Sequence, residues 1–213
     1  MKNWMFLFVL AGFLSCKNES NVTEGKLKYE NKIKEDVSFL ADDKLEGRQT
    51  GTEGEIKAAE YLVKRFKAAG LQPKGTDGFL QSFSFKPKTD PHSEVEFTTN
   101  ADSTITGNNV IGYIDNNAST TIIIGAHYDH LGYGGEGSLF RAEEKAIHNG
   151  ADDNASGVAV LLDLATKLSI DNQSEEIKDK NNYLIMAFSG EEMGLLGSNY
   201  FAKNPTIDAE SIN

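Results

Sequence analysis

The sequence of 213 residues contains one cysteine, Cys16, and only four histidines. No cysteine follows position 16, so the rest of the chain can form no disulfide and offers no thiolate to a metal. Any metal site must therefore be built from histidine and carboxylate side chains. Positive charge is also scarce, because 21 basic residues stand against 32 acidic residues and give a formal net charge of −11. This balance argues against nucleic acid as a partner.

After residue 16 the sequence has no apolar run that is typical of a transmembrane segment. Residues 1–16 carry one lysine, a short apolar run from Trp4 to Leu14, and then Ser15 and Cys16. The run is too short for a stable membrane span and is typical of a secretory signal. The cysteine at its end resembles the lipobox of bacterial lipoproteins, in which the cysteine is lipidated. The alternative is an ordinary signal peptide with an incidental cysteine.

The lipoprotein interpretation predicts an exported protein that is anchored to a bacterial membrane through Cys16, in the periplasm or at the cell surface. Residues 17–25 are polar and are expected to form a flexible tether. Residues 26–213 are enough for one domain with a substantial core.

The pattern of apolar residues predicts alternating strands and helices. Helical spacing indicates helices at 26–40, 53–69, 156–169 and 194–202. Alternating or continuous apolar residues indicate strands at 79–85, 95–99, 109–114, 121–126 and 183–188. The strands at 121–126 and 183–188 are continuous apolar runs, which favours burial on both faces. We therefore predict an α/β fold, a three-layer α/β/α sandwich with a mixed, mostly parallel sheet.

Candidate metal ligands stand at the ends of these predicted elements. His127 follows the strand at 121–126, and Glu191 and Glu192 follow the strand at 183–188. Because binding crevices in such sheets lie beyond the carboxyl ends of the strands, these side chains are expected to meet at one rim. Imidazole and carboxylate groups can hold zinc and activate water on it.

Each segment has a simpler interpretation when it is taken alone. A single histidine after a strand can be a surface or core residue, although Asp129 could hydrogen-bond its second nitrogen. Asp152 and Asp153 precede a helix, so one carboxylate could cap that helix while the other faces the site. Glu191 and Glu192 could be two solvated acids. In extended chain, however, they would point to opposite sides, one to a metal and one to a substrate.

Three segments, 125–129, 149–157 and 190–198, resemble peptidase family M28 of zinc exopeptidases. The resemblance covers roughly residue 40 to residue 213, including the loop at 45–48. It implies that His127 binds one zinc ion, that Asp152 bridges two ions and that Glu192 binds the second. It also implies a structural place for Asp153 at the site, with a cis peptide bond between Asp152 and Asp153.

The same resemblance implies the chemistry of the site. Glu191 is the expected general base, which takes a proton from water and passes it to the leaving amine of a peptide substrate. Asp129 is expected to orient the metal-binding histidine. The remaining family ligands, an aspartate on a later strand and a late histidine, have no match in this sequence. We therefore expect a domain that is incomplete at its C-terminus and holds one zinc ion or none, where a complete site holds two.

Two other functions remain open at this point. One is a glutaminyl-cyclase-like enzyme with a single zinc ion, and the other is a non-catalytic, peptidase-like binding module. The combination of His127 and Asp129 with two adjacent glutamates favours the two-metal peptidase. The sequence does not distinguish an aminopeptidase from a carboxypeptidase or a dipeptide-releasing enzyme, and it leaves the oligomeric state open.

Overall fold

The computed structural model describes residues 32–87, 95–98, 104–134, 138, 144–172 and 181–213. The predicted signal segment 1–16 with Cys16, the tether 17–25 and the start of the predicted helix 26–40 lie outside the described residues. The described part of that helix, residues 32–40, is helical as expected. None of the helices in the described ranges has both the length and the apolar character that crossing a bilayer requires.

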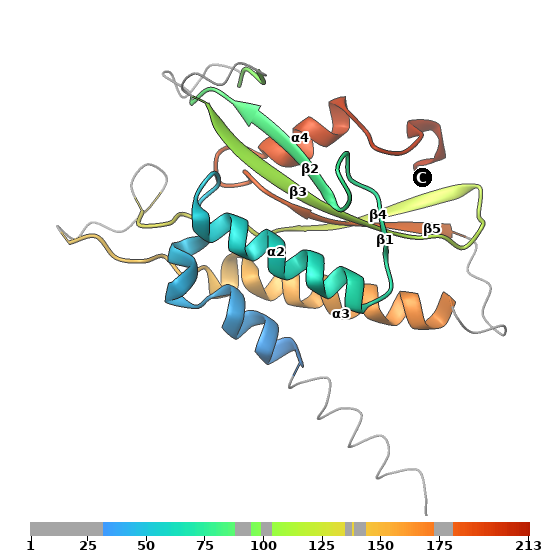
Figure 1. The fold of residues 1–213 in the computed structure, drawn as a ribbon, viewed down its shortest axis with the longest axis horizontal. Coiled ribbons are helices and arrows are strands. Elements are labelled where there is room, and N and C mark those ends of the chain that lie inside the picture. The colour runs from blue at the N-terminus through green and yellow to red at the C-terminus, as the bar shows by residue number, and fades with distance from the viewer. Residues whose placement is uncertain (1–31, 88–94, 99–103, 135–137, 139–143, 173–180) are drawn as a thin grey trace, which may run out of the picture.

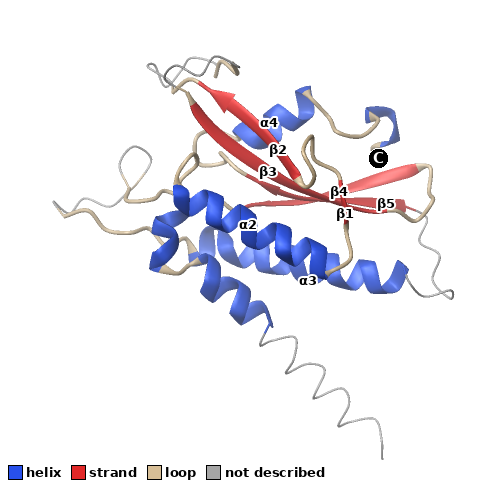
Figure 2. Cartoon of the chain, in the orientation of Figure 1, coloured by secondary structure: helices blue, strands red, loops and turns tan. Residues whose placement is uncertain are grey.

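A mixed β-sheet forms the middle of the fold (Figure 2). Within the described residues it has five strands, in the order β1-β3-β5-β4, with β2 paired to β3. The strands are β1 (Gln72–Pro73), β2 (Leu80–Phe85), β3 (Ile105–Ile114), β4 (Thr120–His127) and β5 (Asn181–Phe188). Four of them match predicted strands, and β1 was not predicted, because two residues carry no periodic signal.

The mixed character of the sheet is confirmed, but parallel pairing is rarer than predicted. Only β4 and β5 pair in parallel, whereas β3 is antiparallel to β5, β2 and β1. The helix α3 (Ser156–Asn172) connects β4 to β5 and returns the chain to the starting end of β4. A short connection joins β3 to β4, so these two strands run in opposite directions with β5 between them. Most strand pairs in the described sheet are therefore antiparallel.

Helices cover both faces of the sheet, which confirms the three-layer arrangement (Figure 1). The helix at 32–40, α2 (Glu53–Ala68) and α3 lie on one face, and α4 (Leu196–Lys203) lies on the other. Side chains that alternate along a strand point to opposite faces. Ile185 accordingly packs in the core beneath α2 and α3, whereas Leu184 packs against Phe201 of α4.

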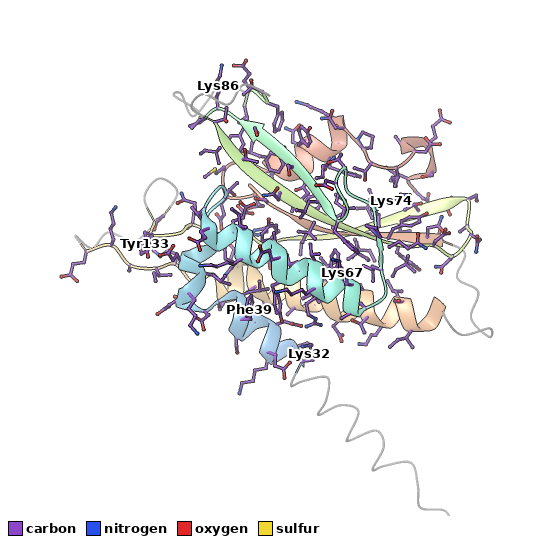
Figure 3. All side chains as sticks on the ribbon, in the orientation of Figure 1. Lys32, Phe39, Lys67, Lys74, Lys86 and Tyr133 are labelled. Atoms are coloured by element: carbon purple, nitrogen blue, oxygen red, sulfur yellow. The ribbon has the colours of Figure 1, made fainter. Side chains whose placement is uncertain are left out.

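The helix α2 follows directly from its sequence. The Thr52 side chain caps its N-terminus by accepting from the Glu55 amide, and Gly70 follows its end with a left-handed φ of 79°. Leu62 and Phe66 are fully buried on its inner face. Burial of each such side chain stabilises the fold by about 1.5–3 kcal/mol. Figure 3 labels Lys67 near the end of α2, where its ammonium lies 5.9 Å from the centre of the Phe79 ring.

Two predictions about strands are wrong. Among the described residues of 95–99 there is only an isolated bridge, which pairs Phe97 with Phe85. The strand β4 is not buried on both faces, since most of its side chains are only partly buried. It lies at the edge of the described sheet, where a single parallel bridge from Ile212 to Thr121 covers its outer side. β5 is buried along most of its length because it lies between two strands.

Candidate metal centre

The carboxyl ends of β4 and β5 meet at one rim of the sheet, on the left in Figure 1. The parallel register pairs His127, the last residue of β4, with Phe188 at the end of β5. His127, Asp153 and Glu192 together offer one imidazole nitrogen and two carboxylate oxygens, all within 4.8 Å of one another. Three segments that are distant in the sequence therefore converge at the rim that the sequence predicted.

Asp153 reaches this group from the turn that precedes α3. Its Oδ1 lies 3.0 Å from Nε2 of His127. The turn begins at Gly150, which is left-handed with φ of 57°, and spans Ala151–Ala155. Asn154, rather than an aspartate, caps α3, because its Oδ1 accepts from the Gly157 amide at 3.1 Å. The carboxylate of Asp153 is therefore free to face the histidine.

The assignment of the ligand position to Asp152 disagrees with this geometry. Both aspartates are exposed, but Asp152 is not a member of the group, and its backbone carbonyl accepts from the Ser156 hydroxyl at 2.9 Å. Asp153 departs from helical dihedral angles, with φ of −117° and ψ of 94°, and its side chain lies against His127. The cis peptide bond is also one residue later than expected, between Asp153 and Asn154.

The two adjacent glutamates occupy different positions, as the sequence predicted. Glu192 belongs to the group and its Oε1 lies 2.6 Å from Nδ1 of His130. Glu191 stands beside the group, with Oε2 at 3.9 Å from Nε2 of His127, and 36% of its side chain is exposed against 18% for Glu192. One carboxylate is thus placed among the ligand atoms and the other at the solvent side.

Asp129 lies beneath this arrangement and is fully buried. Its Oδ1 lies 3.7 Å from Nδ1 of His127, the ring nitrogen that does not face Asp153, and its backbone carbonyl oxygen lies nearer to the same nitrogen, at 3.3 Å. The carboxylate also accepts hydrogen bonds that the sequence did not reveal. Glu191 donates its backbone amide to Oδ1 at 3.1 Å and Glu192 donates its amide to Oδ2 at 3.3 Å.

Acidic side chains dominate the electrostatics of the site. Burial lowers the pKa of His127, but the adjacent carboxylate of Asp129, with the charges of Glu191 and Asp153, outweighs burial and raises this pKa to about 9. Burial raises the pKa of Glu192, and its hydrogen bond with His130 opposes the shift. Several carboxylates around one imidazole form a charge pattern that a divalent cation would neutralise.

Arg48 supports the site, although the sequence pattern does not indicate this role. It is fully buried in the 3₁₀ helix η1 (Asp43–Arg48). Its guanidinium donates to the carbonyl oxygens of Tyr128 at 2.7 Å, Asn149 at 2.7 Å and Gly150 at 3.0 Å, and also to that of Leu40. Burial lowers the pKa of Arg48 to about 10, against the opposing charges of nearby acids. The residue ties the segment after His127 to the turn that carries Asp153.

A second contact holds the same part of the molecule together. Tyr133, labelled in Figure 3, lies on the loop after β4, and its hydroxyl donates to Oε1 of Glu46 at 3.0 Å. Glu46 belongs to η1, so the loop and the helix that carries Arg48 are joined on the outside as well as in the interior. The sequence does not predict the contacts of Arg48 or the contact between Tyr133 and Glu46, because the partners are far apart along the chain.

The side chains present fit a zinc ion. Zinc binds imidazole nitrogen and carboxylate oxygen, and catalytic zinc commonly has three protein ligands with one position left for water or substrate. His127, Asp153 and Glu192 supply that number and type of ligand atom. A cavity of about 310 Å³, lined among others by His127, Glu191 and Leu195, lies beside the group.

Comparison with known proteins agrees with this geometry. The model of peptidase family M28 matches residues 109–213. This part of the chain is therefore similar to members of that family. The M28 region contains all three residues of the candidate metal group and both glutamates.

Proteins similar to this chain include some that are named as aminopeptidases. The chain is 30% identical over 104 residues, 49% of its length, to a protein of Arthroderma otae named "probable leucine aminopeptidase". Its fold resembles that of a leucine aminopeptidase precursor from Bacteroides thetaiotaomicron, with a TM-score of 0.59 and 20% identity over 85% of the chain. A glutaminyl cyclase from the same organism has a TM-score of 0.60 and 20% identity over 85% of the chain.

The chain is shorter than these proteins. It spans 26% of the length of the Arthroderma otae protein, and 59% and 58% of the two Bacteroides chains. The two structural likenesses show that the chain shares the fold of these proteins, and the candidate metal centre lies within residues 109–213, which match the family model.

Proposed function

We propose that this chain carries part of the active site of a zinc-dependent exopeptidase of the aminopeptidase type. The observation that supports the proposal most is the convergence of His127, Asp153 and Glu192 within 4.8 Å, with Glu191 beside them. The M28 match and the relatives named as leucine aminopeptidases favour a peptide with a free N-terminus as the substrate class.

The roles of the residues follow from their positions. His127, Asp153 and Glu192 would hold a zinc ion, which when bound supplies a Lewis acid that polarises the scissile carbonyl and acidifies water. Glu191 is the best-placed proton carrier, because its carboxylate lies beside the group and is partly open to solvent. It would accept the proton of the attacking water and deliver it to the leaving amine. A complete site in our proposal holds two zinc ions, of which the described ligands account for one.

A glutaminyl-cyclase-like reaction is the second candidate. Three ligand atoms suit a single zinc ion, and a bacterial glutaminyl cyclase has the same fold. A peptide with N-terminal glutamine separates the two functions. Release of ammonia without release of glutamine would favour the cyclase, and release of the terminal residue would favour the peptidase.

We also propose that the protein is exported and anchored to the membrane by a lipid on Cys16. The support is the sequence of residues 1–16 alone. Replacement of Cys16 by serine in the native host should move the protein from the membrane fraction to the soluble fraction. Retention of the Cys16→Ser protein in the membrane fraction would contradict the anchor.

The Glu191→Gln variant tests the catalytic proposal. We expect it to bind as much zinc as the wild-type chain, measured by atomic absorption, and to hydrolyse leucine 4-nitroanilide about 10²–10⁴-fold more slowly. Glu210→Gln, an exposed acid far along the chain, is the matched control and should keep the wild-type rate. Equal rates for the wild type and Glu191→Gln, both above the rate without protein, would contradict the role of Glu191.

A further inference from the structure

The turn after β5 is held to the rest of the molecule at each of its residues. The Ser189 hydroxyl donates to Oε1 of Glu55 at 2.6 Å, and the Gly190 amide donates to Oγ1 of Thr50 at 3.1 Å. Ser189, Thr50 and Glu55 are all buried. The first half of the turn is therefore anchored to the segment that begins α2, which lies far from it in the sequence.

The second half of the turn carries the two glutamates and is anchored to the same segment through Asp129. Glu191 and Glu192 donate their amides to the two oxygens of Asp129. Thr50 donates its hydroxyl proton to Oδ2 of the same carboxylate, at 3.1 Å. The Thr50 hydroxyl thus accepts from Gly190 and donates to Asp129, and it joins the two halves of the turn.

Glu55 connects this turn to the strand that carries His127. Besides Ser189, its carboxylate accepts from the amides of Gly51 at 2.8 Å and Asn108 at 3.0 Å, and it lies 2.9 Å from the Tyr128 hydroxyl. Tyr128 directly follows His127. One buried carboxylate therefore contacts the start of α2, β3 and the ends of both β4 and β5.

These contacts go beyond what the sheet and the helix require. The ladder between β4 and β5 is complete without Thr50 or Glu55, and α2 already has its cap in Thr52. The hydrogen bonds instead fix the orientation of a turn whose side chains face the metal group. Groups that orient metal ligands through such contacts tune metal affinity although they do not touch the ion.

We propose that Thr50 and Glu55 are positioning residues that hold the Glu191–Glu192 turn in register with His127. The inference rests on the proposed zinc site, because the consequence of correct register is metal binding. Thr50 acts through Asp129 and the Gly190 amide, and Glu55 acts through Ser189 and Tyr128. Neither side chain is expected to contact substrate or metal.

A pair of substitutions at Thr50 tests the proposal. Thr50→Val keeps the shape of the side chain and removes the hydroxyl, whereas Thr50→Ser keeps the hydroxyl. Two quantities are measured on the full chain: zinc affinity, by competition with a chromophoric chelator, and amide hydrogen exchange of residues 189–192 in the metal-free protein. We expect Thr50→Val to bind zinc about 10–100-fold more weakly and to exchange these amides faster. Thr50→Ser should remain close to the wild type in both.

Phe66→Leu provides the stability control, because Phe66 is buried on the inner face of α2 and its apolar side chain forms none of the hydrogen bonds described above. It should lower the thermal midpoint without changing zinc affinity or exchange in the turn. If Thr50→Val behaves like Phe66→Leu, the proposal is overturned. Ser189→Ala, which removes only the hydroxyl that reaches Glu55, serves as a second variant if Thr50→Val does not fold, and the same criteria apply to it.

The two readouts separate this inference from the proposed function. A wild-type chain that binds no zinc would count against the proposed function. The exchange data would then decide the inference alone: faster exchange in Thr50→Val than in Thr50→Ser supports positioning of the turn, and equal exchange overturns it.

Discussion

Oδ1 of Asp153 lies 3.0 Å from Nε2 of His127, which joins the turn before α3 to the carboxyl end of β4. The contact selects one of two adjacent aspartates as the partner of the histidine. It also explains why Asn154 caps α3, because a cap at Asp153 would withdraw its carboxylate from the rim. The geometry of the metal centre therefore depends on the conformation of this turn.

Substitution of the two aspartates should have unequal effects on zinc binding. We expect Asp153→Ala to weaken zinc affinity by about 100-fold or more, because loss of a direct ligand exceeds the 10–100-fold effect of an orienting partner. Asp152→Ala is the matched control and should bind zinc as the wild type does. Calorimetric titration with zinc measures both. A larger loss in Asp152→Ala than in Asp153→Ala would return the ligand role to Asp152.

Because Asn154 caps α3, its substitution should affect the stability of the fold more than substitution of Asp153 does. Asn154→Ala should lower the free energy of unfolding by about 1 kcal/mol, since the Gly157 amide loses its acceptor. Asp153→Ala should destabilise the metal-free chain less than Asn154→Ala does, because the contact of Asp153 with His127 is made by a side chain that is 65% exposed. Urea unfolding without metal compares the two variants, and a greater destabilisation by Asp153→Ala would show that the cap is assigned to the wrong residue.

Arg48 should be intolerant of lysine. Its planar guanidinium donates to four carbonyl groups in different directions, and an ammonium cannot reach the same set. We expect Arg48→Lys to lower the free energy of unfolding by about 3 kcal/mol. Arg65→Lys is the control, because Arg65 pairs with a single carboxylate, that of Asp36, which lysine can also contact. Similar urea midpoints for Arg48→Lys and Arg65→Lys would contradict the stabilising role of the four hydrogen bonds from Arg48.

The raised pKa of Glu55 should make the stability of the fold depend on pH. Burial raises the pKa of Glu55, and the hydrogen bonds to its carboxylate only partly oppose the shift. A carboxyl with a raised pKa binds its proton more tightly in the folded state than in the unfolded state. Its contribution to stability is therefore lost as the pH rises from the usual value of 4.5 through the folded-state pKa.

Urea unfolding of the wild type and Glu55→Gln between about pH 4 and pH 8 measures this contribution. The wild type should lose stability relative to Glu55→Gln as the pH rises above 4.5. Glu60→Gln, an exposed position on the same helix, should follow the wild-type curve. A constant difference between the wild type and Glu55→Gln across the range would rule out a raised pKa.

Local elements of the fold could be predicted from the sequence because their signals are periodic and short. The spacing of Leu62 and Phe66, with Gly70 after them, located α2 to within one residue at its C-terminal end. The continuous run before Phe188 located β5. The order of the strands was beyond such signals, since the insertion of β5 between β3 and β4 depends on contacts between distant segments.

The candidate site shows the same division. The positions of His127, Glu191 and Glu192 at strand ends were enough to place them at one rim. The sequence could not decide between Asp152 and Asp153, because adjacent residues in a turn share their sequence context and differ in their dihedral angles. Thr50 and Glu55 gave no signal of their long-range role. The spacing of Thr52 and Glu55 indicates only a local helix cap, whereas the Glu55 side chain reaches Ser189.

The most direct test of the proposed metal centre is a crystal of the chain grown with zinc and measured on both sides of the zinc absorption edge. We expect an anomalous peak bounded by Nε2 of His127 and the carboxylates of Asp153 and Glu192, with Glu191 beside it and not among the ligands. A peak coordinated by Asp152, or no peak at this rim with zinc in excess, would contradict it.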